Sequence, residues 1–329
     1  MENSIHITQN VIIVPTKDHY EWLDYAKGIG IILVIMGHCI FPMHILIDIF
    51  HIPLFFLLAG VTFSPKSNTN FIIGKINRIG IPYCFWTIIS SIANLIPHPY
   101  NGIFNGPLWF LQTLFVSLIL MQISIKLNNI LSKVFFAVLF LLSIISTKYN
   151  LDYLPFYLPR CATGFIYIYI GYKLSYYIKL SHRLIQEIFI SISFLCLFIL
   201  LFIYLKKQYN ISGLFVTLSI YDHNYILAFI CSLLGIFVTI SFSKIFRYNT
   251  IINWMGKNSL VIMCVHFPFA ESLNVYISSL PYYDNLIFRA VAAICEYIII
   301  IFISCLFILL CKKIIPSLTG YKPLLRFDK

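Results

Sequence analysis

Long apolar stretches separated by short polar segments run along almost the whole chain. About 20 apolar residues are enough to cross a lipid bilayer as an α-helix. The pattern therefore predicts ten membrane-spanning helices and no soluble domain. The predicted spans lie near residues 28–43, 46–63, 79–97, 107–125, 133–147, 156–178, 184–205, 224–243, 257–280 and 287–312.

The predicted fold class is an all-α polytopic membrane bundle. A tight turn near Pro42 would join the first two spans, and Pro268 is expected to interrupt or kink the ninth. The sequence then divides into a cytoplasmic N-terminal segment (1–20), one membrane domain (21–313) and a basic cytoplasmic tail (314–329).

The distribution of positive charge predicts the orientation of these spans. Ten spans place both ends of the chain on one side, and Lys and Arg favour the cytoplasmic side of membrane proteins. With cytoplasmic ends, most of the 23 Lys and Arg residues face the cytoplasm. The exceptions are Lys148, Arg160, Lys206, Lys207 and Arg289. The expected location is the cytoplasmic (inner) membrane, crossed many times, and the high Ile, Asn, Lys and Tyr content is typical of an AT-rich bacterial genome.

Composition supports a membrane protein and excludes other classes. The chain of 329 residues is 60% hydrophobic and 11% charged, whereas soluble domains carry about 25% charged residues. The net charge of +11 is spread between the spans instead of lying on one soluble face, so the expected partner is the lipid bilayer and not nucleic acid. The nine cysteines lie mostly in apolar runs without a C-x-x-C pair, which predicts no metal site.

The first span carries the most informative polar residues, Asp24, Lys27 and His38. Eleven residues of α-helix place Lys27 and His38 on one face, about 16 Å apart along the axis. Ionisable residues in a membrane helix usually mark a functional path, and histidine suits general-base chemistry on a hydroxyl. A simpler interpretation is a hydrogen-bonded His38 and a Lys27 that pairs with Asp24 or extends to the interface.

A second basic element, Lys75-Ile76-Asn77-Arg78, precedes the third span. Lys75 and Arg78 are three residues apart and share a helical face, which suits a phosphate-rich ligand. The alternative is that both residues only follow the rule for cytoplasmic positive charge.

Further candidates lie toward the outer side. His51 begins the second span, so it could line one outward-facing cavity together with His38. His266 lies within the ninth span, five residues before Glu271, and a buried polar group there needs a partner. Each of these histidines also fits a purely structural role.

Trp109 and Arg160 lie at predicted outer ends of spans. Trp109 fits an aromatic-belt anchor or, less simply, a stacking surface for a sugar, and Arg160 fits an interfacial anchor. The pattern from His44 to Asp48 looks like a soluble acyltransferase signature but lies in a turn between membrane spans.

Four segments together resemble a known family. They are WLDYAKGIGIILVIMGHC, FHIPLFFLLAG, KINRIGIPYCFW and GKNSLVIMCVHFPF, with GPLWFL as a weaker match. In this order they resemble the acyltransferase-3 family of membrane-bound acyltransferases, and in particular its stand-alone members similar to fucose 4-O-acetylases.

The resemblance implies ten membrane helices, a cytoplasmic acyl donor that is usually acetyl-CoA, and an acceptor that is commonly an envelope glycan. His38 matches the family's proposed catalytic histidine, and Lys27 matches the basic residue of its R/K-x10-H motif. Lys75 and Arg78 match its R-x-x-R pair, which is suggested to bind the coenzyme.

The sequence departs from the family pattern in three places. Lys75 replaces the more usual arginine, and Ala59 replaces a frequent serine before Gly60. The soluble hydrolase-like domain fused to some members is absent, so either a separate periplasmic or extracellular transferase acts as a partner or transfer is direct.

The expected function is therefore transfer of acetyl from acetyl-CoA to a sugar hydroxyl of an envelope or extracellular polysaccharide, or of its lipid-linked precursor. His38 would act as general base with Lys27 and Asp24 beside it, although an acetyl-histidine intermediate stays open. The competing hypothesis is a transporter or flippase for a lipid-linked glycan, because intramembrane histidines also suit proton-coupled transport. Only the acyltransferase needs the basic pair at Lys75 and Arg78 for coenzyme phosphate.

Overall fold

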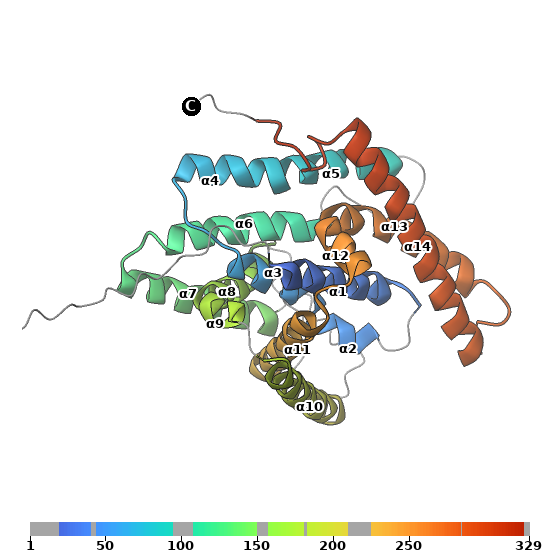
Figure 1. The fold of residues 1–329 in the computed structure, drawn as a ribbon, viewed down its shortest axis with the longest axis horizontal. Coiled ribbons are helices and arrows are strands. Elements are labelled where there is room, and N and C mark those ends of the chain that lie inside the picture. The colour runs from blue at the N-terminus through green and yellow to red at the C-terminus, as the bar shows by residue number, and fades with distance from the viewer. Residues whose placement is uncertain are drawn as a thin grey trace, which may run out of the picture.

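The structure is a computed structural model that describes residues 20–40, 44–94, 108–149, 157–180, 183–209, 225–283 and 285–325 (Figure 1). All regular secondary structure in these ranges is helical. The helices are α1 (Glu21–His38), α2 (His44–Asp48), α3 (His51–Val61), α4 (Asn68–Lys75), the π-helix η1 (Ile76–Gly80), α5 (Ile81–Asn94), α6 (Trp109–Ser124), α7 (Asn129–Lys148), α8 (Leu158–Lys173), α9 (Ser175–Lys179), α10 (Leu184–Tyr209), α11 (Tyr225–Phe246), α12 (Thr250–Lys257), α13 (Ser259–Ser278) and α14 (Leu286–Ile314).

The all-helical prediction is confirmed for the described residues, and each predicted span contains helical residues. Within the described part of the chain, five helices are long and apolar enough to cross a membrane, namely α7, α10, α11, α13 and α14. The region Leu46–Val61 and α6 are apolar but shorter. A helical membrane protein is thus supported, whereas ten spans and cytoplasmic ends stay predictions.

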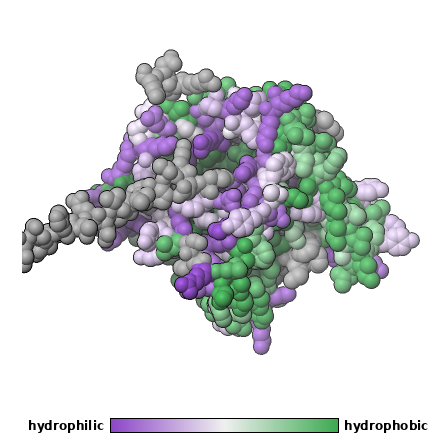
Figure 2. Space-filling view, viewed as in Figure 1, coloured by the Kyte–Doolittle hydropathy of each residue, from purple (hydrophilic) through white to green (hydrophobic). Residues whose placement is uncertain are grey.

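The outer helices expose apolar side chains. Leu200 on α10 is 66% exposed and Ile287 on α14 is 76% exposed. Figure 2 shows hydrophobic residues covering α10 and α14, while hydrophilic residues gather over the middle of the same face. An apolar surface of this extent is unfavourable in water and suits contact with lipid tails.

Two sequence expectations about helix continuity are wrong. The second predicted span is not one helix, because α2 ends at Asp48 and α3 begins at His51. Pro53 lies in the first turn of α3, where its missing N–H costs nothing. The expected interruption at Pro268 is also wrong, because α13 continues through it. The predicted turn at Pro42 lies outside the described residues.

The contact between α1 and α12 is so close that their backbones touch. A Cβ atom on Gly256 would lie 1.8 Å from the carbonyl oxygen of Asp24, and one on Gly28 would lie 2.1 Å from that of Ile252. Small residues permit this approach, as in many membrane helix pairs. The crossing brings Lys257, the last residue of α12, next to the first turns of α1.

Gly256→Ala should therefore destabilise the fold, although alanine is the better helix former. Overpacking at such a contact costs about 1–3 kcal/mol, so we expect a lower unfolding temperature in detergent. Gly74→Ala is the matched control, because a Cβ atom there would meet nothing within 4 Å. Equal unfolding temperatures for the two variants would contradict the proposed importance of the crossing.

Candidate functional site

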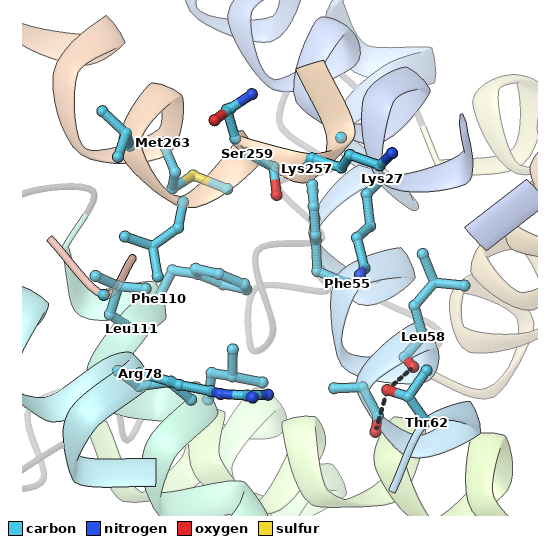
Figure 3. A pocket seen from close by; sticks show the side chains of 18 of the residues that line it. Lys27, Phe55, Leu58, Thr62, Arg78, Phe110, Leu111, Lys257, Ser259 and Met263 are labelled. Atoms are coloured by element: carbon cyan, nitrogen blue, oxygen red, sulfur yellow. Dashed lines mark hydrogen bonds between the residues drawn. The ribbon is translucent and has the colours of Figure 1, made fainter. Parts of the chain in front are cut away.

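A cavity of about 570 Å³ lies between the start of α1, α3, η1, α6 and the α12–α13 junction. Figure 3 shows Arg78 reaching into it from one wall, with Lys27 and Phe55 on the opposite wall. The lining residues are Asp24, Lys27, Phe55, Leu58, Ala59, Thr62, Lys75, Arg78, Ile79, Phe110, Leu111, Leu114, Leu118, Gly256, Lys257, Asn258, Ser259, Leu260, Val261, Met263, Thr319, Gly320 and Tyr321.

Positive charge dominates the polar part of the lining. Asp24 is buried and is the one carboxylate among the described residues that line the cavity. Its Oδ1 lies 3.7 Å from Nζ of Lys27, and its Oδ2 lies 3.9 Å from Nζ of Lys257. Because Lys75 and Arg78 add two further cations, the cavity carries excess positive charge and attracts anions.

Burial and neighbouring positive charges both act on Lys75. Burial lowers the pKa of its ammonium group to about 8, and the positive charges of Arg78 and Lys66 lower it further in the same direction. The Nζ atom also lies 5.3 Å from the ring centroid of Phe71. An anion bound beside Lys75 would therefore relieve an existing electrostatic cost.

The local backbone explains how Lys75 and Arg78 both reach the cavity. Lys75 is the last residue of α4, and Arg78 lies in the middle of the π-helix η1, which joins α4 to α5. Single π-helical turns inside α-helices are frequent at functional sites. The predicted pairing of these two cations is thus reproduced in their placement, since both line the same cavity.

The remaining wall of the cavity is apolar. Phe55 of α3 and Phe110 of α6 meet edge to face with ring centroids 5.8 Å apart. Leu111 and Met263 lie nearby on the lining. A ligand that fits both parts of this cavity has an anionic end and a less polar end.

Three histidines form a separate cluster, defined here as His38, His51 and His266. The ring centroids of His38 and His266 are 5.2 Å apart. His51 lies next to Gly37, because a Cβ atom on Gly37 would be 3.9 Å from its Cε1. None of the three histidines lines the cavity.

Backbone contacts define the proton positions of two members of the cluster. Nδ1 of His51 donates to the carbonyl of Ile47 at 2.9 Å, and Nδ1 of His266 donates to that of Ile262 at 3.0 Å. A carbonyl oxygen only accepts, so in a neutral ring Nε2 carries no proton and is an acceptor. Nε2 of the fully buried His266 has no hydrogen-bond partner among the described residues.

The polar residues of the first predicted span thus lie in two separate regions, the cavity and the histidine cluster. The predicted pairing of Asp24 with Lys27 is reproduced, and both residues line the cavity. His38 lies about 16 Å farther along the same helix, where Asn274 of α13 donates to its backbone carbonyl at 2.7 Å. His51 lies near His38 as expected, but the described cavity is lined by neither.

The structure also places the remaining candidates, Trp109, Arg160 and Glu271. The guanidinium of Arg160 lies 4.8 Å from the ring centroid of Trp109 and 5.0 Å from that of Tyr157. The sequence treated Trp109 and Arg160 separately, whereas the fold makes them one cation–π pair. Glu271 is half-buried on α13 and lies close enough to His38 for an electrostatic interaction.

Sequence reasoning missed several residues that the fold brings to these sites. Lys257 was interpreted only as a topology signal, although it lies in the GKNSLVIM segment that carried the resemblance. Glu296 of α14 is 1% exposed and accepts from the backbone N–H of Ile40 at 3.1 Å. The segment from Thr319 to Tyr321 lies in no motif, so no sequence signal pointed to it.

Apolar outer helices, a cationic cavity and a separate histidine cluster define a helical membrane protein. Comparison with known proteins identifies its family. The family model described as an acyltransferase domain matches residues 20–313, nearly the whole chain. The chain therefore belongs to the acyltransferase-3 family, which confirms the resemblance seen in its motifs.

Part of the chain is also similar to a curated protein. The chain is 27% identical over 135 residues to the nodulation protein NolL of Mesorhizobium japonicum. That match covers 32% of this chain and 36% of NolL, so the chain matches about a third of this relative. No solved structure matches significantly.

Proposed function

We propose that this protein is a membrane-bound O-acetyltransferase that uses acetyl-CoA. The acceptor is a sugar hydroxyl of a cell-envelope or extracellular polysaccharide, or of its lipid-linked precursor. The observation that carries the proposal is the pairing of cations with an apolar wall in one cavity of an acyltransferase-family chain. Membership of that family favours this function over the transporter.

Coenzyme A matches the two parts of the cavity. Its diphosphate and 3′-phosphate are strongly anionic, and Lys75 and Arg78 are suited to hold them. Its pantetheine arm is long and uncharged, so it can lie against Phe55 and Phe110. In this arrangement Lys27 and Lys257 share Asp24 and help to neutralise the remaining phosphate charge.

His38 is the proposed general base. It removes the proton of the sugar hydroxyl while the oxygen attacks the thioester carbonyl. The carbon–sulfur bond then breaks, and the leaving thiolate takes the proton from His38. Separate binding and reaction regions fit this scheme, because His38 lies beyond the cavity on the same helix as Lys27.

The acceptor is proposed to approach the histidine cluster. Nε2 of His266 offers a hydrogen-bond acceptor close to His38, and His51 and Glu271 lie nearby. The Trp109–Arg160 pair is the proposed contact for a sugar ring, because sugars stack on aromatic faces. A separate periplasmic or extracellular transferase, or direct transfer, would complete the pathway.

The double variant Lys75→Ala/Arg78→Ala should bind acetyl-CoA at least about tenfold more weakly. Each charge-assisted hydrogen bond to phosphate is worth roughly 1.5–3 kcal/mol before solvent screening. Titration calorimetry on detergent-purified protein measures the affinity. Lys206→Ala/Lys207→Ala is the matched control, because both lysines are exposed at the end of α10, outside the cavity. A folded wild-type protein that does not bind acetyl-CoA would contradict the proposal.

The affinity for acetyl-CoA should fall as the pH rises from 7 to 9. Because the pKa of Lys75 is lowered to about 8, the free protein carries this charge below pH 8 and loses it above. Phosphate favours the charged form, so binding above pH 8 must take up a proton. Lys75→Arg stays charged and should show a flatter profile. Identical pH profiles for the two proteins would rule out this role of Lys75.

His38→Ala should lose transfer by a factor of about 10²–10⁴, the usual contribution of a general base. Acetyl-CoA affinity should stay unchanged, because His38 does not line the cavity. Transfer of labelled acetyl to envelope polysaccharide in membranes measures the first quantity, and calorimetry measures the second. Transfer at the wild-type rate would remove His38 from the mechanism.

A further inference from the structure

After α14 the chain turns back across the molecule as a short segment without helix, residues Pro316–Leu325, called here the C-terminal strap. Figure 1 shows it beside α5. The strap lies beyond residues 20–313, the range that the family model matches. Its role in this chain therefore has to be argued from its own contacts.

One end of the strap is held by Asn77, whose side chain is buried within η1. Its Oδ1 accepts from the backbone N–H groups of Leu324 at 2.9 Å and Leu325 at 2.8 Å. Its Nδ2 donates to the carbonyl of Leu325 at 3.0 Å. Three hydrogen bonds from one buried amide fix the strap to η1, which contains Arg78 and directly follows Lys75.

The middle of the strap is held from the other side of the cavity. The hydroxyl of Tyr321 donates to Oδ1 of Asn258, at the α12–α13 junction, with a distance of 2.8 Å. The Nζ atom of Lys312 lies 5.1 Å from the ring centroid of Tyr321. Thr319 is 2% exposed. The strap therefore connects η1 to the α12–α13 junction instead of trailing into solvent.

Gly320 lets the strap lie close to η1. Its φ of +82° is in the left-handed region that favours glycine. A Cβ atom there would lie 3.2 Å from Cγ of Pro82 and 3.4 Å from the carbonyl oxygen of Arg78. Thr319, Gly320 and Tyr321 themselves line the cavity. The strap is thus a wall of the cavity, in direct contact with the segment that bears Arg78.

We propose that the C-terminal strap forms part of the donor site and binds the nucleotide end of acyl-CoA, an inference that rests on the proposed function. Lys75 and Arg78, the proposed phosphate contacts, line the cavity on the side where the strap is fixed. The apolar wall is formed by side chains of α3 and α6. In coenzyme A the adenosine is joined directly to the diphosphate. If the cations hold the phosphates, the adenosine lies next to the strap. The ring of Tyr321 is only half-buried and offers a face for a purine base.

The test compares two donors, acetyl-CoA and S-acetylpantetheine, which lacks the nucleotide. Gly320→Ala displaces the strap without touching a charge, and Asn77→Ala removes its three hydrogen bonds. Each variant should lose at least about tenfold in affinity for acetyl-CoA and keep its affinity for S-acetylpantetheine. Gly74→Ala, with open space around its Cβ position, is the matched control and should keep both affinities.

The outcomes separate the inference from the function on which it rests. Wild-type protein that binds neither donor refutes both. If the wild-type protein binds acetyl-CoA and Gly320→Ala binds it equally well, the proposed role of the strap is refuted and the proposed function is not. Equal losses for both donors in Gly320→Ala also refute it, because they indicate a general disturbance of the fold. A loss confined to acetyl-CoA, with an unchanged unfolding temperature, supports the strap as a nucleotide-binding element.

Discussion

The backbone contact between α1 and α12 determines where the cationic cavity and the histidine cluster lie. At this crossing Gly28 and Gly256 leave no room for a side chain. The next residue, Lys257, therefore comes within reach of Asp24, and the chain turns at once into α13. α13 then carries His266 alongside α1 to His38. The close contact at these two glycines thus fixes the position of the cations at one end of α1 and of the histidines at its other end.

Electrostatics explains why the cationic end is suited to a ligand. Among the described lining residues, Asp24 is the one carboxylate beside four cations, Lys27, Lys75, Arg78 and Lys257. Burial, together with the positive charges of Arg78 and Lys66, lowers the pKa of Lys75, so its ammonium group is held at an electrostatic cost. The excess of cations over carboxylates among the described lining residues suits the binding of an anion.

The sequence predicted local features well and long-range features poorly. The pairing of Asp24 with Lys27 depends only on helical periodicity, and so does the shared placement of Lys75 and Arg78. Lys257 and Tyr321 could not be assigned, because they reach the cavity only through tertiary packing between distant segments. The break between α2 and α3 was missed because hydrophobicity continues across it, and only the position of Pro53 hinted at a new helix.

The separation of the cavity from the histidines has a physical reason in the proposed reaction. Phosphates are very costly to move into a low-dielectric interior, so their cations belong near the membrane surface. A base that activates a hydroxyl works best away from competing water. His38 lies outside the cationic cavity, at the opposite end of α1. The distance of about 16 Å along α1 then has to be bridged by the donor itself. A donor with a long uncharged arm between its phosphates and its thioester meets both requirements, and the apolar wall at Phe55 and Phe110 offers a path for that arm.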